Sequence, residues 1–227
     1  MRPHESKSSY SRSEMNEATL VLSTGVSRAV AAVAGTTTPP PSGGSVAAAA
    51  GALAAALTQM VAGLTAGRPR YANVVAEMDR VAGRAAALAH RLTQLVSGDA
   101  AAYGAVGVAY GMPRATEDER TVRLRAIQRA LLPAPEAPLE IARLASEVAE
   151  LAADVAERGN VNAVADAAVA AILADAVSRA AALTVRANVP ALEDQSLAAR
   201  WKSEANAFAS ASSAANARAV AAAERAS

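Results

Sequence analysis

Residues 36–70 read TTTPPPSGGSVAAAAGALAAALTQMVAGLTAGRPR, and this stretch decides the fold. A helix follows the proline and glycine residues, and it carries no charged side chain before Arg68. A helix that is apolar on every side must be covered on every side, so we expect it inside a helical assembly. The backbone N–H groups at its start have no partner within the helix and could bind an anion or a polar ligand. The residues that would offer these groups are Ser42, Gly43, Gly44 and Ser45.

The composition predicts an all-α fold. Of the 227 residues, 52% are hydrophobic and 3% are aromatic, and alanine supplies most of the hydrophobic share. Alanine favours helices over strands. It also buries little area, so the core gains when two subunits share it. We therefore expect an antiparallel bundle of long helices around alanine-rich central helices, in the form of a homodimer. The net charge of +1 argues against a nucleic-acid partner.

The chain has few residues that bind metals or form disulfides. It has no cysteine, and His4 and His90 are its two histidines. Disulfides and thiolate metal sites are therefore excluded, and a histidine-built metal site within one chain is nearly so. We expect neither a metal nor a prosthetic group.

Two apolar runs could be mistaken for targeting or membrane segments. Residues 18–33 faintly resemble a signal peptide, but acidic residues before them and Arg28 within them argue against that interpretation. Residues 46–66 are long enough to span a bilayer, but alanine, glycine and Gln59 make them a poor membrane helix. We expect a buried helix, no membrane partner and a cytoplasmic protein.

Periodicity divides the chain into a mobile tail at 1–13 and a single helical domain at 14–227. Thr116 and Glu119 form a capping box, which predicts a helix that begins just after Thr116. Ser97 and Gly98 are expected to end one helix, and Asp99 to cap the next. The predicted helices are 14–33, 46–66, 71–97, 100–110, 117–132, 138–158 and 161–185, and a last helix carries Leu197, Trp201 and Phe208 before it fades into alanine and serine.

Two aspartates could carry chemistry. Spacing alone favours Asp99 as a helix cap, and the functional alternative is a general acid or base in a polar cleft. Asp175 and Arg179 can pair one turn apart on the helix predicted at 161–185. Asp166 has no such local partner, so it faces solvent, meets a basic side chain from elsewhere or lines a site.

Several polar residues at helix ends and turns admit two interpretations. Asparagines at helix ends usually cap, and arginines in turns are usually solvated. In a site for a polyanionic ligand the same residues would bind it. These residues are Arg68, Arg70, Arg114, Asn160, Asn162, Arg186 and Asn188.

Seven short motifs occur in a set order. They are Pro41–Ala48 (PSGGSVAA), Leu64–Tyr71 (LTAGRPRY), Asp99–Tyr103 (DAAAY), Ala109–Arg114 (AYGMPR), Glu136–Leu139 (EAPL), Gly159–Ala167 (GNVNAVADA) and Val185–Asn188 (VRAN). The ordered set resembles the cyclodeaminase/cyclohydrolase family of tetrahydrofolate enzymes. That family includes the cyclodeaminase part of formiminotransferase-cyclodeaminase and bacterial methenyltetrahydrofolate cyclohydrolases.

The resemblance implies a helical homodimer with a folate cleft. Asp99 matches the family's proton donor and Asp166 its second prominent aspartate, while the glycine–serine loop and the basic positions would hold the pterin and the glutamate tail. The implied reaction is hydrolysis of 5,10-methenyltetrahydrofolate to 10-formyltetrahydrofolate. The alternatives are deamination of 5-formiminotetrahydrofolate and a non-catalytic helical dimer. The chain departs from the family pattern at Ser42, Ala165 and Ala168, and it has arginine where the family has lysine.

Overall fold

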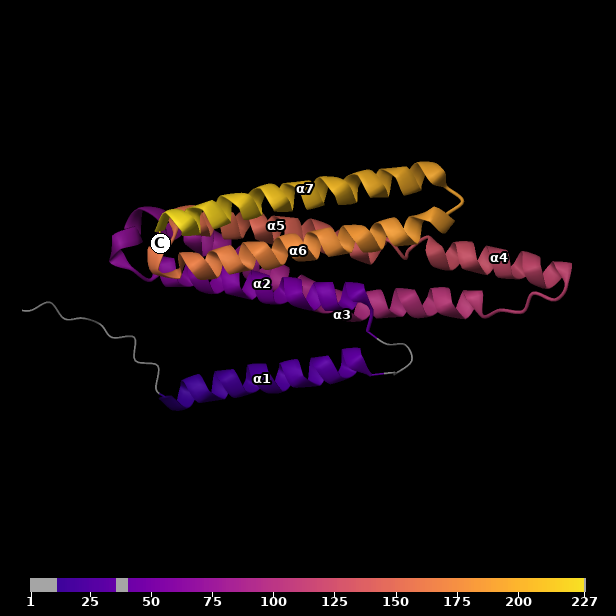
Figure 1. The fold of residues 1–227 in the computed structure, drawn as a ribbon, viewed down its shortest axis with the longest axis horizontal. Coiled ribbons are helices and arrows are strands. Elements are labelled where there is room, and N and C mark those ends of the chain that lie inside the picture. The colour runs from indigo at the N-terminus through magenta and orange to yellow at the C-terminus, as the bar shows by residue number, and fades with distance from the viewer. Residues whose placement is uncertain (1–11, 36–40, 227) are drawn as a thin grey trace, which may run out of the picture. The chain divides into compact units, whose positions relative to one another are not determined.

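The structure is a computed structural model that describes the backbone of residues 12–35 and 41–226, without the side chains of 12–16, 18 and 98–103. Within these ranges all regular structure is helical, which confirms the all-α prediction. The α-helices are α1 (Arg12–Ala34), α2 (Gly43–Ala66), α3 (Val75–Tyr110), α4 (Glu117–Leu131), α5 (Glu136–Arg158), α6 (Val164–Asn188) and α7 (Gln195–Ala226), with short 3-10 turns η1 (Pro69–Val74), η2 (Val161–Ala163) and η3 (Val189–Ala191) (Figure 1).

The chain divides into two compact units, Met1–Pro41 and Ser42–Ser227. The first contains α1, which confirms the helix predicted at 14–33, and its larger apolar side chains are exposed. The predicted mobile tail at 1–13 lies almost wholly outside the described residues. The extent of the helical domain from residue 14 stays a prediction.

The second unit is a bundle of long helices in which consecutive helices run in opposite directions, except that α5 continues in the direction of α4 (Figure 1). Gly51 of α2 lies at the crossing of three helices, because a Cβ there would lie 3.3 Å from both Leu92 of α3 and Val177 of α6. A side chain at position 51 would require Leu92 and Val177 to shift by a few tenths of an ångström, so the small residue lets the three helices pack closely here.

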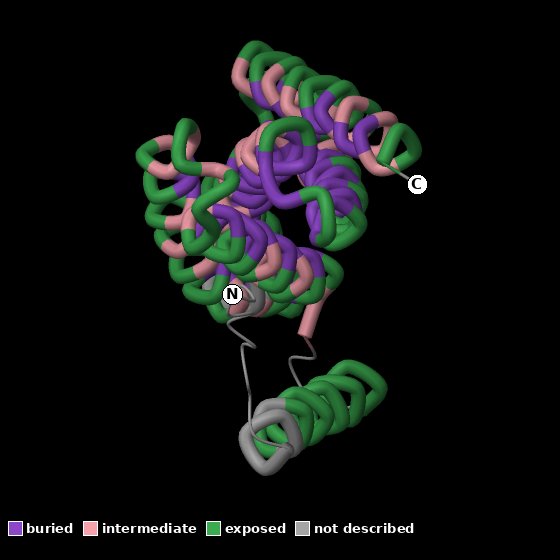
Figure 2. The backbone as a smooth tube through the Cα atoms, turned by 90° about the vertical axis from the view of Figure 1, so that its left-hand side faces the viewer, coloured by how far each residue is buried: buried purple, intermediate pink, exposed green. Residues whose placement is uncertain are grey.

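The core of the bundle combines alanines with a few large side chains. Many alanines of α2, α5 and α6 are fully buried, and Figure 2 shows the buried segments turned toward one another. Met78, Leu88 and Leu92 of α3, together with Ile141 of α5, are the bulkiest side chains that are fully buried. A second cluster at one end joins Ile127 and other side chains of α4 to α6 and α7 around Trp201.

Two predicted helix boundaries are wrong. α3 continues through Ser97, Gly98 and Asp99 to Tyr110, so Asp99 is not a cap. The Ser97 hydroxyl donates to the Gln94 carbonyl and leaves the helix intact, and one glycine inside a helix costs only about 1 kcal/mol. The last helix does not fade either. α7 reaches Ala226, because Ala215, Ala219 and other small residues pack against the bundle.

The expectation that residues 46–66 are covered on every side is also wrong for a single chain. The side chains of Val46, Leu53, Met60 and Leu64 on α2 are 42–54% exposed. α2 and the segment Val161–Ala191 are both long and apolar enough to cross a membrane by length and composition, and about half of each apolar window is buried in the fold.

Candidate functional site

The start of α2 is fixed against the later part of α3. Ser42 caps α2 by accepting a hydrogen bond from the Ser45 backbone N–H at 3.4 Å. The buried Ser45 hydroxyl donates to the carbonyl of Val96 at 2.8 Å. Asp99 follows Val96 by three residues in the same helix. The glycine–serine loop therefore meets α3 within one turn of Asp99.

The other end of α2 contacts the turn between α5 and α6. The Thr65 hydroxyl accepts a hydrogen bond from the Asn160 backbone N–H at 2.9 Å, and the Tyr71 hydroxyl accepts one from the Val161 N–H at 3.1 Å. The Asn160 side chain is buried and caps η2 through the Asn162 N–H at 3.1 Å. Asn160 is thus a helix cap, one of the two roles that its position allowed.

Asp166 lies in the first turn of α6, close to this second contact. Its side chain is exposed, and among the described residues its carboxylate has no hydrogen-bond or ion-pair partner. A negative charge is favourable at a helix N-terminus. The sequence left three possibilities for Asp166: it faces solvent, pairs with a basic side chain or lines a site. The described residues provide no basic partner, so Asp166 either faces solvent or lines a site.

The basic positions occupy different parts of the bundle. Arg68 and Arg70 are exposed beyond the end of α2, and the Arg70 guanidinium lies 5.8 Å from the centre of the Tyr71 ring. Arg114 lines an open pocket of about 360 Å³ together with Arg120, Arg123 and Leu124 of α4.

Arg186 lines a groove of about 520 Å³ between α6 and α7. Its guanidinium donates to the amide oxygen of Asn206 at 2.7 Å, so its charge has a neutral partner. Asn188 is the last residue of α6 and caps η3 without a side-chain hydrogen bond.

The candidate residues thus form two groups at opposite ends of α2. Ser45 and Thr65 are about 30 Å apart along the helix axis. α6 runs antiparallel to α2, with Val177 beside Gly51 and Asn160 beside Thr65. The loop group is Ser42, Gly43, Gly44, Ser45 and Asp99, and the turn group is Arg68, Arg70, Asn160, Asn162 and Asp166. Arg186 and Asn188 at the end of α6, and Arg114 beyond the end of α3, lie toward the same end of the bundle as the loop group. One chain does not bring Asp99 and Asp166 together.

Asp175 has partners that sequence reasoning missed. Its carboxylate is 6% exposed and accepts hydrogen bonds from the hydroxyls of Ser212 and Ser213 at 2.9 and 2.8 Å. The predicted ion pair with Arg179 is present but longer, at 3.8 Å. The serines of α7 on an otherwise alanine-rich helix were the available signal, because hydroxyls can satisfy a buried carboxylate.

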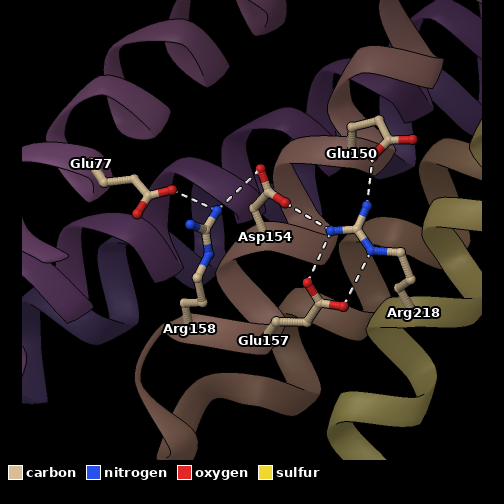
Figure 3. A network of polar contacts seen from close by, with 6 residues as sticks. All are labelled: Glu77, Glu150, Asp154, Glu157, Arg158 and Arg218. Carbon is tan, nitrogen blue, oxygen red and sulfur yellow. Dashed lines mark hydrogen bonds and ion pairs between the residues drawn. The ribbon is translucent and has the colours of Figure 1, made fainter.

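A cluster of charged side chains joins α3, α5 and α7 (Figure 3). Arg218 of α7 donates to Glu150, Asp154 and Glu157 of α5 at 2.8–3.2 Å. Arg158 bridges from α5 to Glu77 of α3. The hydrogen bonds from Arg218 hold the pKa of Glu157 below its usual value and raise the pKa of Arg218. Every carboxylate in the cluster has a cationic partner, so this is a structural network.

The sequence profile of the formiminotransferase-cyclodeaminase family matches residues 26–207, which is most of the chain. The chain belongs to this family. The resemblance inferred from the seven motifs is thereby confirmed. Among solved structures, the fold is similar to that of formiminotetrahydrofolate cyclodeaminase from Thermotoga maritima, with a TM-score of 0.76, 28% identity and coverage of 86% of this chain and 93% of that one.

Two curated relatives also resemble this family member. The chain is 39% identical to methenyltetrahydrofolate cyclohydrolase of Methylorubrum extorquens over 123 residues, which span 54% of this chain and 59% of the relative. It is 31% identical to formimidoyltransferase-cyclodeaminase of Rattus norvegicus over 120 residues, which span 53% of this chain and 22% of the relative. The aligned region thus covers about three fifths of the first relative and about a fifth of the second.

Proposed function

We propose that the protein hydrolyses 5,10-methenyltetrahydrofolate to 10-formyltetrahydrofolate. The single observation that carries the proposal is the 39% identity to a protein named methenyltetrahydrofolate cyclohydrolase. The contact of Ser45 with Val96 supports it, because this contact brings the glycine–serine loop within one turn of Asp99.

The reaction needs a group that handles protons beside a cationic substrate. Water attacks the methenyl carbon, which lies between N5 and N10, and a carboxylate at Asp99 takes a proton from that water as general base. The bond from the carbon to N5 then breaks, N5 becomes an amine, and the formyl group stays on N10. One proton is released overall. A carboxylate also stabilises the cationic ring electrostatically, so one aspartate can serve both purposes.

The loop and the arginines suit the rest of a folate. The backbone N–H groups of Gly43 and Gly44, in the first turn of α2, suit polar or anionic acceptors of the ligand. Folate ends in a glutamate whose carboxylates favour arginine, and Arg114 and Arg186 lie toward the same end of the bundle as the loop. Arg68, Arg70 and the residues Asn160, Asn162, Asp166 and Asn188 complete the proposed set.

Deamination of 5-formiminotetrahydrofolate is the second candidate. The solved structure that the fold resembles is named formiminotetrahydrofolate cyclodeaminase. In that reaction N10 attacks the formimino carbon and ammonia leaves, so Asp99 would act as the general acid that protonates the departing nitrogen. A non-catalytic dimer is the third possibility, because Ser42 places a side chain where the family loop has glycine.

We also infer a homodimer in the cytoplasm, without nucleic-acid or membrane partners and without a prosthetic group. The exposed apolar side chains of α2, Val46, Leu53, Met60 and Leu64, are the observation that favours a second copy. An apolar surface of this kind on a soluble protein usually marks an interaction site.

One assay separates the candidates. The purified protein is mixed with methenyltetrahydrofolate while its absorbance is followed, and with formiminotetrahydrofolate while ammonia is measured. Faster loss of methenyl absorbance indicates the hydrolase, ammonia release indicates the deaminase, and neither indicates the non-catalytic dimer. Asp99→Asn should abolish the activity that appears, and Asp79→Asn, an exposed aspartate earlier on α3, should keep it. An active Asp99→Asn protein would remove Asp99 from the mechanism.

A further inference from the structure

The turn between α5 and α6 is held by two side chains from an earlier part of the chain. The Thr65 hydroxyl, at the end of α2, accepts a hydrogen bond from the Asn160 N–H at 2.9 Å. The Tyr71 hydroxyl, in η1, accepts one from the next N–H, that of Val161, at 3.1 Å. The partners are 95 and 90 residues apart in the sequence. The path of the turn is therefore fixed by the segment from Thr65 to Tyr71.

The contact with Thr65 is buried and tight. Thr65 is fully buried, and its hydroxyl also donates to the Val61 carbonyl at 2.8 Å. A Cβ at Gly159 would lie 3.0 Å from this hydroxyl oxygen and would collide with the carbonyl oxygen of Val155, so the approach requires glycine. Loss of the hydroxyl would leave the Asn160 N–H buried and unpaired. This contact therefore serves the stability of the fold as well as the turn.

The contact with Tyr71 lies nearer the surface. Val161 is 47% exposed, so water can bind its N–H when the Tyr71 hydroxyl is removed. The Tyr71 ring also lies 5.8 Å from the Arg70 guanidinium, a distance typical of a cation–π contact. One side chain thus contacts both the turn and a basic residue of the turn group. Its hydroxyl can be removed with little effect on the stability of the fold.

The turn leads directly to two candidate site residues. η2 begins at Val161 and continues into α6 at Val164, and Asn162 and Asp166 lie four residues apart at this start. Both are exposed. Within the described part of the chain, the Asp166 carboxylate has no hydrogen bond or ion pair of its own. Its position therefore depends on the backbone of the turn.

We propose that Tyr71 is a positioning residue of the folate site, whose hydroxyl fixes the turn that presents Asn162 and Asp166 to the ligand. Thr65 supports the same turn from the buried side. The inference rests on the proposed function for the identity of the ligand. In this role Tyr71 does not contact the folate and acts through the N–H of Val161. A small displacement of groups that contact a ligand has a large effect, so loss of one hydroxyl is measurable.

A spin label tests the positioning without a ligand. Because the chain has no cysteine, Asp166→Cys gives a single attachment site. Tyr71→Phe should increase the mobility of a nitroxide at position 166, measured by electron paramagnetic resonance, because the turn loses one of its two contacts. A nitroxide on Ala187→Cys, an exposed position near the other end of α6, should not change. Equal spectra at position 166 with and without the Tyr71 hydroxyl would overturn the proposal.

Affinity for a folate tests the consequence for the site. The probe is 5-formyltetrahydrofolate, a stable reduced folate, and the method is isothermal titration calorimetry. Tyr71→Phe keeps the ring beside Arg70 and should weaken binding by about three- to tenfold, the size of one hydrogen bond, while the melting temperature stays that of wild type. An unchanged affinity would contradict the proposal.

Tyr110→Phe is the matched control. Tyr110 also lies beside an arginine, with its ring centre 5.6 Å from the Arg123 guanidinium. Among the described residues, however, its hydroxyl has no hydrogen-bond partner. Tyr110→Phe should therefore bind the probe as wild type does. An equal loss of affinity in both variants would show a general effect of removing a tyrosine hydroxyl and would overturn the specific role of Tyr71.

The effect of Tyr71 must pass through the residues that it positions. In a protein with Asn162→Ala and Asp166→Ala, affinity is already reduced, and Tyr71→Phe should reduce it by less than about twofold further. A purely structural role of Tyr71 would give the same three- to tenfold loss in both backgrounds, and that result would overturn the proposal.

These readouts separate the failure of this inference from that of the proposed function. A wild-type protein that binds the probe but acts on neither methenyl- nor formiminotetrahydrofolate removes the proposed reaction and leaves the role of Tyr71. An active wild-type protein whose affinity does not change in Tyr71→Phe removes the role of Tyr71 alone. A wild-type protein that neither binds the probe nor acts on either substrate removes folate as the ligand, and the role of Tyr71 at a folate site is removed with it.

Discussion

The solvent-exposed faces of α2 and α5 differ in the side chains that they carry. α5 presents Glu150, Asp154 and Glu157, which are held by Arg218. α2 presents Val46, Leu53 and Met60, and it has no charged residue at all. The two helices belong to the same bundle and have similar lengths. The first face is suited to water, whereas the second is suited to another protein surface, and this difference in charge is the reason for proposing an interface on α2.

The largest effect is expected from a charged substitution on the uncharged face of α2. Leu53→Lys places an ammonium group on the proposed dimer surface of α2 in each copy and removes leucine side chains that the dimer would bury, at a cost of about 2–4 kcal/mol per dimer. The protein should become monomeric by light scattering and lose its folate activity, while its helicity by circular dichroism is unchanged. The matched control is Leu132→Lys, a leucine of similar exposure at the end of α4. A dimeric, active Leu53→Lys protein would contradict the assignment of the α2 face.

The second largest effect is expected from removing the arginine that binds the carboxylates of α5. Arg218→Met leaves three carboxylates close together without their shared cation, and it should lower the free energy of unfolding by about 1–2 kcal/mol, since these side chains are partly exposed. Arg200→Met, which removes only an exposed pair with Glu204, should change it by less than about 0.5 kcal/mol. Thermal melts of the two variants measure the difference. Equal losses would mean that the network around Arg218 acts as a set of ordinary surface pairs.

Lowering the pH should reduce the stability that the charged side chains of α5 contribute, and it should not affect the contacts of the uncharged face of α2. Hydrogen bonds from Arg218 and Arg91 lower the pKa values of Glu157 and Glu140 respectively. A lowered pKa contributes stability above the pKa of the unfolded chain, and this contribution is lost as the pH falls through the folded value. The melting temperature should therefore fall between about pH 5 and about pH 2, and less steeply in Arg218→Met. Parallel curves for the two proteins would exclude a contribution from Glu157.

The smallest expected effect is that of salt on the stability of the protein. About 1 M sodium chloride shortens the screening length to about 3 Å and should reduce the difference in stability between wild type and Arg218→Met. Dimer dissociation measured by analytical ultracentrifugation should not increase, because the exposed apolar face of α2 has no charges for salt to screen. Dissociation that rises with salt would show that ion pairs, and not apolar contacts, hold the dimer.

The class of the fold, most of the helices and the family could all be predicted from the amino-acid sequence. The alanine content, the apolar periodicity and the capping box at Thr116 are local signals, and the structure contains the capping box as predicted. The boundary at Ser97 and Gly98 failed because α3 packs on both sides of it, at Leu95 and at Ala109, and this outweighs a local preference for ending a helix. The aspartates at 99 and 166 were found from motifs that need no spatial information.

Only the tertiary structure decided which residues are neighbours. It placed Ser45 against Val96, Thr65 against Asn160, and Asp175 beneath two hydroxyls of α7. It also divided the candidate site between two ends of one helix and left one side of that helix uncovered. The physical reason is that helix direction and burial depend on contacts between segments far apart in the chain. A pattern along one helix states which sides are apolar, but not which of them the same chain covers.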